Sequence, residues 1–192
     1  EPDYEVLHQG RYVRLVRKNG WEFVEREGIS GIVVIVAVTD DQRLVLVEQH
    51  RIPLDGRVIE LPAGMVGDRP EDRDESFAAA ALRELREETG YEAASVHRLT
   101  SGPYSPARSN ALYAFFRAVG LRRVSEGGGD EHEDIAVHEV PLAEVDAWLE
   151  AKAEEWERLA RKGGRLDAGE LAAATDWRSH FAAELGMSDA LH

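Results

Sequence analysis

A run of β-branched residues early in the chain predicts a deeply buried strand. Residues 31–39 read GIVVIVAVT, without the alternation of apolar and polar side chains that marks a strand with one face in water. Such a strand must be covered on both faces, so the chain must build layers around it. Apolar residues make up 43% of the 192 residues, enough to supply these layers in one domain with appendages.

Other patterns surround this strand. Residues 4–27 alternate apolar and polar side chains around the turn signal Lys18-Asn19-Gly20, and they predict two or three strands of an antiparallel ribbon. Further strands are predicted at 43–48, 58–61, 96–100, 111–119 and 135–140, and helices at 75–89, 141–161 and 168–185. Residues 65–74, which are polar and contain Gly and Pro, predict a loop. The order predicts an α+β fold with a mixed sheet and C-terminal helices.

Composition excludes several classes of function. The net charge of −14 argues against a nucleic-acid partner, because the phosphate backbone would be repelled. The acidity suits a protein that collects divalent cations, although it is equally explained by solubility. No cysteine is present, so disulfides, thiolate nucleophiles and zinc-thiolate sites are excluded. The first ten residues do not resemble a signal peptide, and residues 32–38 are too few to span a bilayer, so we expect a cytoplasmic protein without a membrane partner.

The chemistry is concentrated in residues 83–91, RELREETGY. On a helix Glu84 and Glu88 lie one turn apart on one face, and Glu87 lies about 60° round the axis from Glu84. The three carboxylates repel one another, and they lie at the helix C-terminus, where the macrodipole disfavours negative charge. A hard cation such as Mg²⁺ or Mn²⁺ would compensate. The alternative is a solvated surface on which nearby arginines pair with these carboxylates.

This stretch resembles the second half of the Nudix box, G-x5-E-x7-R-E-U-x-E-E-x-G-U, in which U is a bulky apolar residue. The matching residues are Arg83, Glu84, Leu85, Glu87, Glu88, Gly90 and Tyr91, with Glu75 at the required spacing before Arg83. The opening glycine departs from the pattern, because position 69 is Arg. Gly64 resembles the displaced glycine and implies a five-residue insertion in loop 65–74, which a surface loop accepts at small entropic cost.

The resemblance implies an α/β/α sandwich and a hydrolase that cleaves diphosphate linkages with Mg²⁺, for which Mn²⁺ is a possible substitute. It implies that Glu84, Glu88 and the backbone carbonyl of Ala63 bind the metal ion. Glu87 would be a further ligand or a catalytic residue that orients water. The structural residues of the box would be Gly64, Glu75, Arg83 and Gly90, with Glu75 and Arg83 joined in an ion pair.

Features outside the box resemble the ADP-ribose pyrophosphatase branch of this family. Pro106 follows the box at the branch's spacing, although residues 107–111, ARSNA, lack the acidic end of the usual Gly-x-Ser-Asp-Glu. In the acidic loop 131–135, Glu131 would be the general base and Glu133 a metal ligand. Glycines 127–129 would let this loop close over substrate. A plain turn at Pro106 and a solvated acidic loop are the alternatives.

The same branch implies the substrate contacts. Arg51, with its forked guanidinium, suits phosphate oxygens, and Trp21 lies where branch members stack an aromatic ring on the base; a Trp packed on the N-terminal sheet is the alternative. Glu60 and Arg108 complete the predicted substrate-binding residues. Residues 1–30 would form a β region that exchanges across a homodimer, and residues 31–192 the Nudix hydrolase domain.

ADP-ribose is therefore the leading substrate, giving AMP and ribose 5-phosphate. GDP-mannose or another nucleotide sugar is the nearest alternative, because the departure at Asn110 weakens the assignment. Dinucleoside polyphosphates, coenzyme A and nucleoside triphosphates are further alternatives. A non-catalytic nucleotide-binding Nudix module is also possible, but such a module would be expected to lose box carboxylates that this chain keeps.

Overall fold

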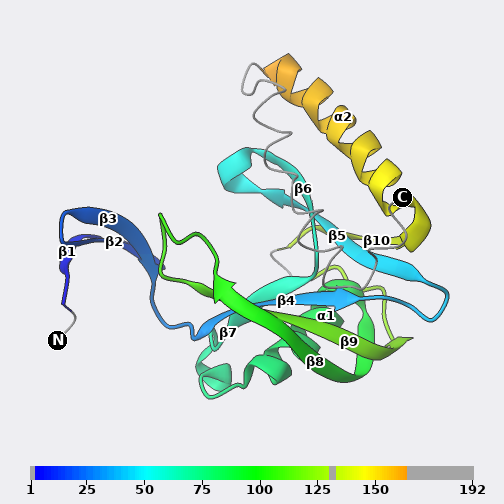
Figure 1. Ribbon diagram of the computed structural model, residues 1–192, viewed down its shortest axis with the longest axis horizontal. Coiled ribbons are helices and arrows are strands. Elements are labelled where there is room, and N and C mark those ends of the chain that lie inside the picture. The colour runs from blue at the N-terminus through cyan, green and yellow to red at the C-terminus, as the bar shows by residue number, and fades with distance from the viewer. Residues whose placement is uncertain (1–2, 130–132, 164–192) are drawn as a thin grey trace. The chain divides into compact units, whose positions relative to one another are not determined.

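The computed structural model describes residues 3–129 and 133–163. The expected helix at 168–185 and the candidate base Glu131 lie outside these residues. The chain divides into two compact units, with the boundary between Glu139 and Val140. The strands form three sheets (Figure 1).

The β-branched run forms β4 (Gly31–Ala37), an inner strand of a four-stranded sheet with the order β7-β4-β9-β8. It pairs antiparallel with β7 (Ala63–Val66) and parallel with β9 (Leu112–Arg123), which pairs antiparallel with β8 (Tyr91–Pro103). Five consecutive residues of β4 are buried, which confirms a strand covered on both faces. The mixed sheet of the expected α+β fold is therefore present.

Helix α1 (Phe77–Thr89) covers this sheet and packs on β8, β7 and β4 (Figure 1). Ser76 caps its first turn by accepting a hydrogen bond from the Ala79 N–H at 3.1 Å. Gly90 ends it in the left-handed conformation, with φ of 73°. The apolar stripe, which includes the fully buried Leu85, joins the core, so the acidic residues of the same helix are held by a rigid element.

A second sheet has the order β10-β5-β6. Its strands are β5 (Arg43–Arg51), β6 (Gly56–Glu60) and β10 (Ile135–Pro141), and a 3-10 turn, Ile52–Leu54, connects β5 to β6. In the second unit the 3-10 turn Leu142–Glu144 leads into α2 (Val145–Gly163), which confirms the helix expected from residue 141. None of the helices among the described residues has the length and apolar character needed to cross a membrane.

The N-terminal ribbon is a separate three-stranded antiparallel sheet of β1 (Glu5–Gln9), β2 (Val13–Lys18) and β3 (Trp21–Arg26) (Figure 1). The predicted turn at Asn19-Gly20 is present, with positive φ at both residues. The sheet is attached to the loop between β8 and β9, where the Val24 N–H donates to the Arg108 carbonyl at 2.8 Å. A short parallel bridge joins Val24 to Ser109 in the same place.

The loop prediction for residues 65–74 was partly wrong. Its first two residues complete β7, whose register with β4 pairs Gly31 with Val66 and Val34 with Ala63. The remainder is a loop that contains one 3-10 turn, Pro70–Asp72. A strand of four residues that includes a glycine has almost no local signal, and pairing with the buried β4 supplies its stability.

Candidate active site

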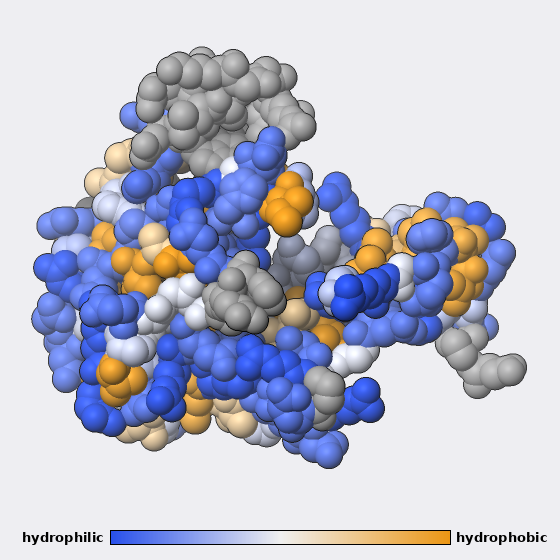
Figure 2. All heavy atoms as spheres, turned by 180° about the vertical axis from the view of Figure 1, so that it is seen from behind, coloured by the Kyte–Doolittle hydropathy of each residue, from blue (hydrophilic) through white to orange (hydrophobic). Residues whose placement is uncertain are grey.

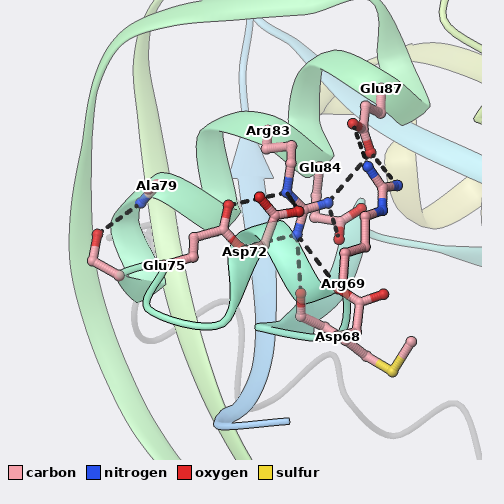
Figure 3. A network of polar contacts seen from close by, with 10 residues as sticks. Asp68, Arg69, Asp72, Glu75, Ala79, Arg83, Glu84 and Glu87 are labelled. Atoms are coloured by element: carbon pink, nitrogen blue, oxygen red, sulfur yellow. Dashed lines mark hydrogen bonds and ion pairs between the residues drawn. The ribbon is translucent and has the colours of Figure 1, made fainter. Parts of the chain in front are cut away.

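Arg83 is the centre of a polar network that joins α1 to the loop before it (Figure 3). Its Nε and Nη2 atoms donate to the two carboxylate oxygens of Glu75, both at 3.0 Å, and Nη2 also donates to the Met65 carbonyl at 3.1 Å. The hydrogen bond with Glu75 is the largest influence on Arg83 and raises its pKa. The structure thus brings the predicted structural pair together and ties both residues to the end of β7.

Glu84 lies against Gly64 on β7. A Cβ atom on Gly64 would lie only 1.9 Å from the Glu84 carboxylate carbon, so no other residue fits there without displacing Glu84. Arg83 donates from Nη1 to Glu84 Oε1 at 2.8 Å. Burial raises the pKa of Glu84 to about 7, against the opposing effect of Arg83. Gly64 therefore allows β7 and α1 to approach closely at Glu84.

Glu88 is the most deeply buried carboxylate of the helix, with 3% of its surface exposed. It accepts a hydrogen bond at 3.0 Å from the Ala63 N–H. Burial raises its pKa to about 8, and although the Ala63 N–H and Arg51 lower it, the charges of Glu84 and Glu133 raise it further. A carboxyl group in such surroundings becomes a stable anion when a cation is placed beside it.

Glu87 lies apart from this pair, on the more exposed side of α1. Arg69 donates two hydrogen bonds to its carboxylate, at 3.2 and 3.1 Å, and Arg83 donates a third at 3.3 Å (Figure 3). Glu87 also lines an open groove of about 690 Å³, together with other residues of α1, the start of β8 and the loop at 125–129. Arg69 was not predicted as a site residue, because it replaces the expected glycine and lies in a loop without periodicity.

The predicted phosphate clamp, Arg51, lies at the end of β5 and donates from Nε to Glu60 Oε2 on β6 at 2.7 Å. Its effect on the pKa of Glu88 links this pair to the acidic helix. Burial raises the pKa of Tyr113 on β9 most strongly, and the charges of Glu60 and Arg51 shift this pKa as well. Its ring packs on Tyr104 with centroids 4.5 Å apart. These two tyrosines were missed, since Tyr113 lies in a strand pattern, where a tyrosine usually indicates packing, and Tyr104 lies in the loop after β8.

The loop that carries Pro106 and Arg108 is attached to the N-terminal sheet by three kinds of hydrogen bond. In addition to the backbone bond from Val24, Trp21 donates from its indole nitrogen to the Ala107 carbonyl at 3.3 Å. Asn110, which stands where the branch has an acidic residue, donates to Glu25 at 2.7 Å. The alternative interpretation required the Trp21 ring to be packed on the N-terminal sheet. Trp21 instead keeps 62% of its surface exposed.

The glycine run holds the end of α1. The N–H groups of Gly128 and Gly129 donate to the carbonyls of Glu88 and Glu87 at 2.9 and 3.0 Å, which satisfies two of the free carbonyls at the helix end. A Cβ atom on Gly127 would lie 2.4 Å from the Thr89 carbonyl carbon. In this structure these glycines are packed on the helix, whereas the sequence suggested that they let a loop close.

The acidic loop is also anchored on its other side. Arg57 on β6 donates to Asp134 at 2.8 Å. Glu133 packs on Gly129, where a Cβ atom would lie 2.4 Å from Glu133 Oε2. The candidate ligand Glu133 is thereby held near Glu88, close enough to raise its pKa.

The donor set fits a hard divalent ion. In the part of the chain that the structure describes, no three acidic, His or Cys side chains already surround a common point. Glu84 is bound to Arg83 and Glu88 to the Ala63 N–H. The carboxylates of Glu84 and Glu88, and the glycine that makes room for Glu84, nevertheless provide an all-oxygen environment of the kind that Mg²⁺ and Mn²⁺ prefer.

Comparisons with known proteins agree with this geometry. The chain matches the NUDIX domain over residues 30–163. It is 32% identical over 155 residues to the methanol dehydrogenase activator of Bacillus methanolicus, covering 77% of this chain and 81% of that protein. It is 35% identical over 125 residues to the ADP-ribose pyrophosphatase of Bacillus subtilis, covering 64% of each. A GDP-mannose pyrophosphatase of Citrobacter koseri is 32% identical over 160 residues, covering 77% of this chain and 80% of that protein.

A solved structure described as an ADP compounds hydrolase superposes with a TM-score of 0.61, covering 85% of this chain and 94% of that one. At 23% identity this likeness concerns the fold, and it confirms the α+β Nudix fold expected from the sequence. The domain match and the relatives establish more than the fold. They show that the chain belongs to the Nudix family and is a Nudix hydrolase.

Proposed function

We propose that this enzyme hydrolyses the diphosphate linkage of ADP-ribose or a related nucleoside diphosphate sugar, using bound Mg²⁺. The observation that carries the proposal is a pair of carboxylates, Glu84 largely shielded from solvent and Glu88 buried, packed against Gly64 and the Ala63 N–H. Divalent ions serve Nudix hydrolases generally, and the absence of imidazole or thiol donors in the pair favours Mg²⁺, with Mn²⁺ as a substitute. The relatives named ADP-ribose pyrophosphatase support the substrate class.

In this proposal Glu84, Glu88, Glu133 and the Ala63 carbonyl would hold the ion. When bound, the ion would neutralise phosphate oxygens and make a water molecule more acidic. Glu87 would orient the attacking water, and Glu131 would accept its proton. The water oxygen then forms a bond to one phosphorus atom as the bond to the bridging oxygen breaks, which yields AMP and ribose 5-phosphate from ADP-ribose.

The remaining predicted residues would bind the two ends of the substrate. Arg51 donates to Glu60 from Nε, so its terminal nitrogens can approach phosphate oxygens. Trp21 would stack on the base. Pro106 and Arg108 would form the adjoining wall, since hydrogen bonds attach their loop to the sheet that carries Trp21.

GDP-mannose is the second candidate, and a specific observation favours it. Asn110 replaces the acidic residue typical of the ADP-ribose branch and is bound to Glu25. A relative named GDP-mannose pyrophosphatase also matches 77% of this chain. The loop at 104–110 would then recognise a different base or sugar, with the same chemistry at the diphosphate.

A substrate panel at fixed Mg²⁺ tests the proposal. ADP-ribose, GDP-mannose, UDP-glucose, diadenosine polyphosphates and coenzyme A are compared by kcat/KM, with products identified by chromatography. We expect ADP-ribose to be cleaved fastest, with AMP as a product and no activity when the metal is chelated. A higher kcat/KM for GDP-mannose would select the second candidate, and activity that survives chelation would contradict the metal site.

We also propose a cytoplasmic homodimer formed through residues 1–30, with residues 31–192 as the hydrolase domain. The N-terminal sheet exposes apolar side chains to solvent (Figure 2). They include Val6 at 44%, Tyr12 at 59%, Val13 at 41% and Val24 at 40% exposure. Covering this surface with a second copy would remove the apolar area from water. The net charge of −14 supports a small-molecule substrate over nucleic acid.

A further inference from the structure

The lengthened loop before α1 places the side chain of Arg69 against the glutamates of α1 (Figure 3). Arg69 occupies the position at which the box pattern expects glycine. Its Nη1 and Nη2 atoms donate to Oε1 and Oε2 of Glu87 at 3.2 and 3.1 Å. Two parallel bonds between a guanidinium and a carboxylate fix the orientation of the carboxylate as well as compensating its charge.

The three helix glutamates are therefore compensated in different ways. Glu87 has guanidinium groups on both oxygens, from Arg69 and Arg83. Glu84 accepts a hydrogen bond from Arg83 on Oε1, and Glu88 accepts one from the neutral Ala63 N–H and is buried. With 33% of its side chain exposed, Glu87 also lines the open groove, which Glu84 and Glu88 do not line. Arg83 contacts both Glu84 and Glu87, so Arg69 is the arginine that distinguishes the outer carboxylate of Glu87 from the pair formed by Glu84 and Glu88.

Without Arg69, Glu87 would keep a single hydrogen bond from Arg83. It lies three residues after Glu84 and one before Glu88, so a divalent ion beside the pair would attract it. A third helix carboxylate on the ion would increase the negative charge around it and strengthen binding. It would also remove Glu87 from the position in which it can orient water.

We propose that Arg69 is a positioning residue that withholds Glu87 from the metal ion. The inference rests on the proposed function and deepens it. It assigns Glu84 and Glu88 as the metal ligands supplied by the helix and leaves Glu87 to orient the attacking water. It also gives the five-residue insertion a role, since the inserted loop carries the guanidinium. A purely structural role for Arg69 would weaken metal binding when the residue is removed, whereas this role predicts stronger binding.

The test is Mn²⁺ binding without substrate, followed by the electron paramagnetic resonance of free Mn²⁺, with the full chain in each variant. We expect R69M to lower the Mn²⁺ Kd by about tenfold, because a third carboxylate becomes available. R69K, which keeps the charge but cannot make two parallel bonds, should give a smaller decrease. R86M is the matched control: Arg86 lines the same groove as Glu87, has 65% of its side chain exposed and contacts Glu92, and its loss should change Kd by less than about twofold.

A double variant isolates the role of Glu87. R69M combined with E87Q should return the Mn²⁺ Kd to the wild-type value, because the freed carboxylate is then absent. Melting temperatures recorded in EDTA show that each variant is folded. Equal decreases in Kd for R69M and R86M, no change in R69M, or an R69M/E87Q variant that still binds tightly would each overturn the inference. A wild-type chain that binds no Mn²⁺ would contradict the proposed function, and the inference with it.

Discussion

Glutamates of one helix meet different surroundings within two turns of α1. Glu84 packs on a glycine beside Arg83, Glu87 is bound by two arginines, and Glu88 is buried against a backbone N–H. Burial raises the pKa of Glu84 to about 7 and of Glu88 to about 8. The surroundings thus assign different chemistry to residues of one type: Glu84 is paired with the Arg83 guanidinium, whereas buried Glu88 accepts its hydrogen bond from a neutral N–H.

Replacing a member of the pair should abolish catalysis while preserving the fold. We expect E88Q to lower kcat by about a hundredfold or more, because a metal ligand is lost. Its melting temperature in EDTA should not fall, since a buried carboxyl near Glu84 and Glu133 is removed. E92Q, at a partly exposed carboxylate of β8, is the control and should keep wild-type kcat. Wild-type turnover in E88Q would refute the ligand role.

Asn110 provides a second test at the scale of one residue. Its amide donates to Glu25, so an acidic residue there would place two carboxylates in contact. We expect N110D to raise KM for the preferred substrate several-fold, because the loop that carries Arg108 would be pushed from the N-terminal sheet. N110A loses the bond without adding repulsion and should have a smaller effect. The comparison uses steady-state kinetics, and a KM in N110D at or below the N110A value would contradict this role.

At the residue scale, spacing along the sequence predicted the members of the box but not their partners. A one-turn separation was enough to place Glu84 and Glu88 on one face, and the resemblance to the Nudix box implied the ion pair of Glu75 and Arg83, which the structure contains. Arg69 could not be found in this way, because its contact depends on the path of an irregular loop. The same applies to Tyr104, which meets Tyr113 only through the pairing of β8 and β9.

At the element scale, strands bounded by clear turn residues were predictable, and those that depend on a neighbour were not. β4 has its signal in its own composition, whereas β7 exists because β4 lies beside it. β8 extends from Tyr91 to Pro103, well beyond the predicted residues 96–100. Its long pairing with β9 carries the ladder through Ser101 and Gly102, which favour turns in isolation.

The glycine run at 127–129 illustrates the same limit. In the sequence three glycines indicate a flexible backbone, whereas in the structure they pack closely on the end of α1. We expect G127A to destabilise the fold by about 2–4 kcal/mol, because its Cβ atom would meet the backbone of Thr89 at 2.4 Å. G20A is a matched control: Gly20 also has positive φ, but nothing lies within 4 Å of an added Cβ. It should cost about 1 kcal/mol, the conformational part alone. Urea unfolding measures both variants, and equal losses would show that the contact with α1 contributes nothing.

The N-terminal sheet should show a pH dependence centred on Glu25. Burial raises the pKa of this carboxyl, but hydrogen bonds from Tyr4, Arg14 and Asn110, with the charge of Arg14, lower it overall from 4.5. A folded-state pKa below the unfolded value stabilises the sheet above pH 4.5, and this contribution is lost as the pH falls through the lowered pKa.

Protonation of Glu25 at low pH should therefore weaken the contact between the N-terminal sheet and the loop at 104–110, because Asn110 of this loop donates to Glu25. The amide proton resonance of Val24, which is bound to the Arg108 carbonyl, reports this contact by NMR. We expect it to shift as the pH falls through the lowered pKa of Glu25, below the ordinary range of a glutamate carboxyl. E25Q, which has no proton to gain, should lack the transition. An identical transition in E25Q would assign the effect to another group.

At the scale of the whole molecule, the exposed apolar side chains of the N-terminal sheet call for a partner surface. Val13 on β2 and Val24 on β3 are both exposed, and Leu15, two residues after Val13 on β2, is the residue that pairs with Val24. A second copy of the same sheet would cover this stripe, as the proposed homodimer requires. The loop that carries Pro106 and Arg108 is attached to this sheet, so association and substrate binding should be linked.

We expect the wild-type protein to elute in size-exclusion chromatography with light scattering at twice the chain mass of 21.4 kDa. V13E should give the single-chain mass, because a charge within the apolar interface would have to be buried. V119E is a matched control, since Val119 on β9 is 42% exposed and Val13 is 41% exposed, but it lies outside the N-terminal sheet. A dimer that survives V13E, or one that V119E disrupts equally, would show that residues 1–30 do not form the interface. If V13E is monomeric and folded, its KM and its metal affinity separate two roles. A raised KM would show that the partner's sheet supports the base-binding end of the site. An unchanged metal affinity would show that the carboxylates on α1 act within one chain.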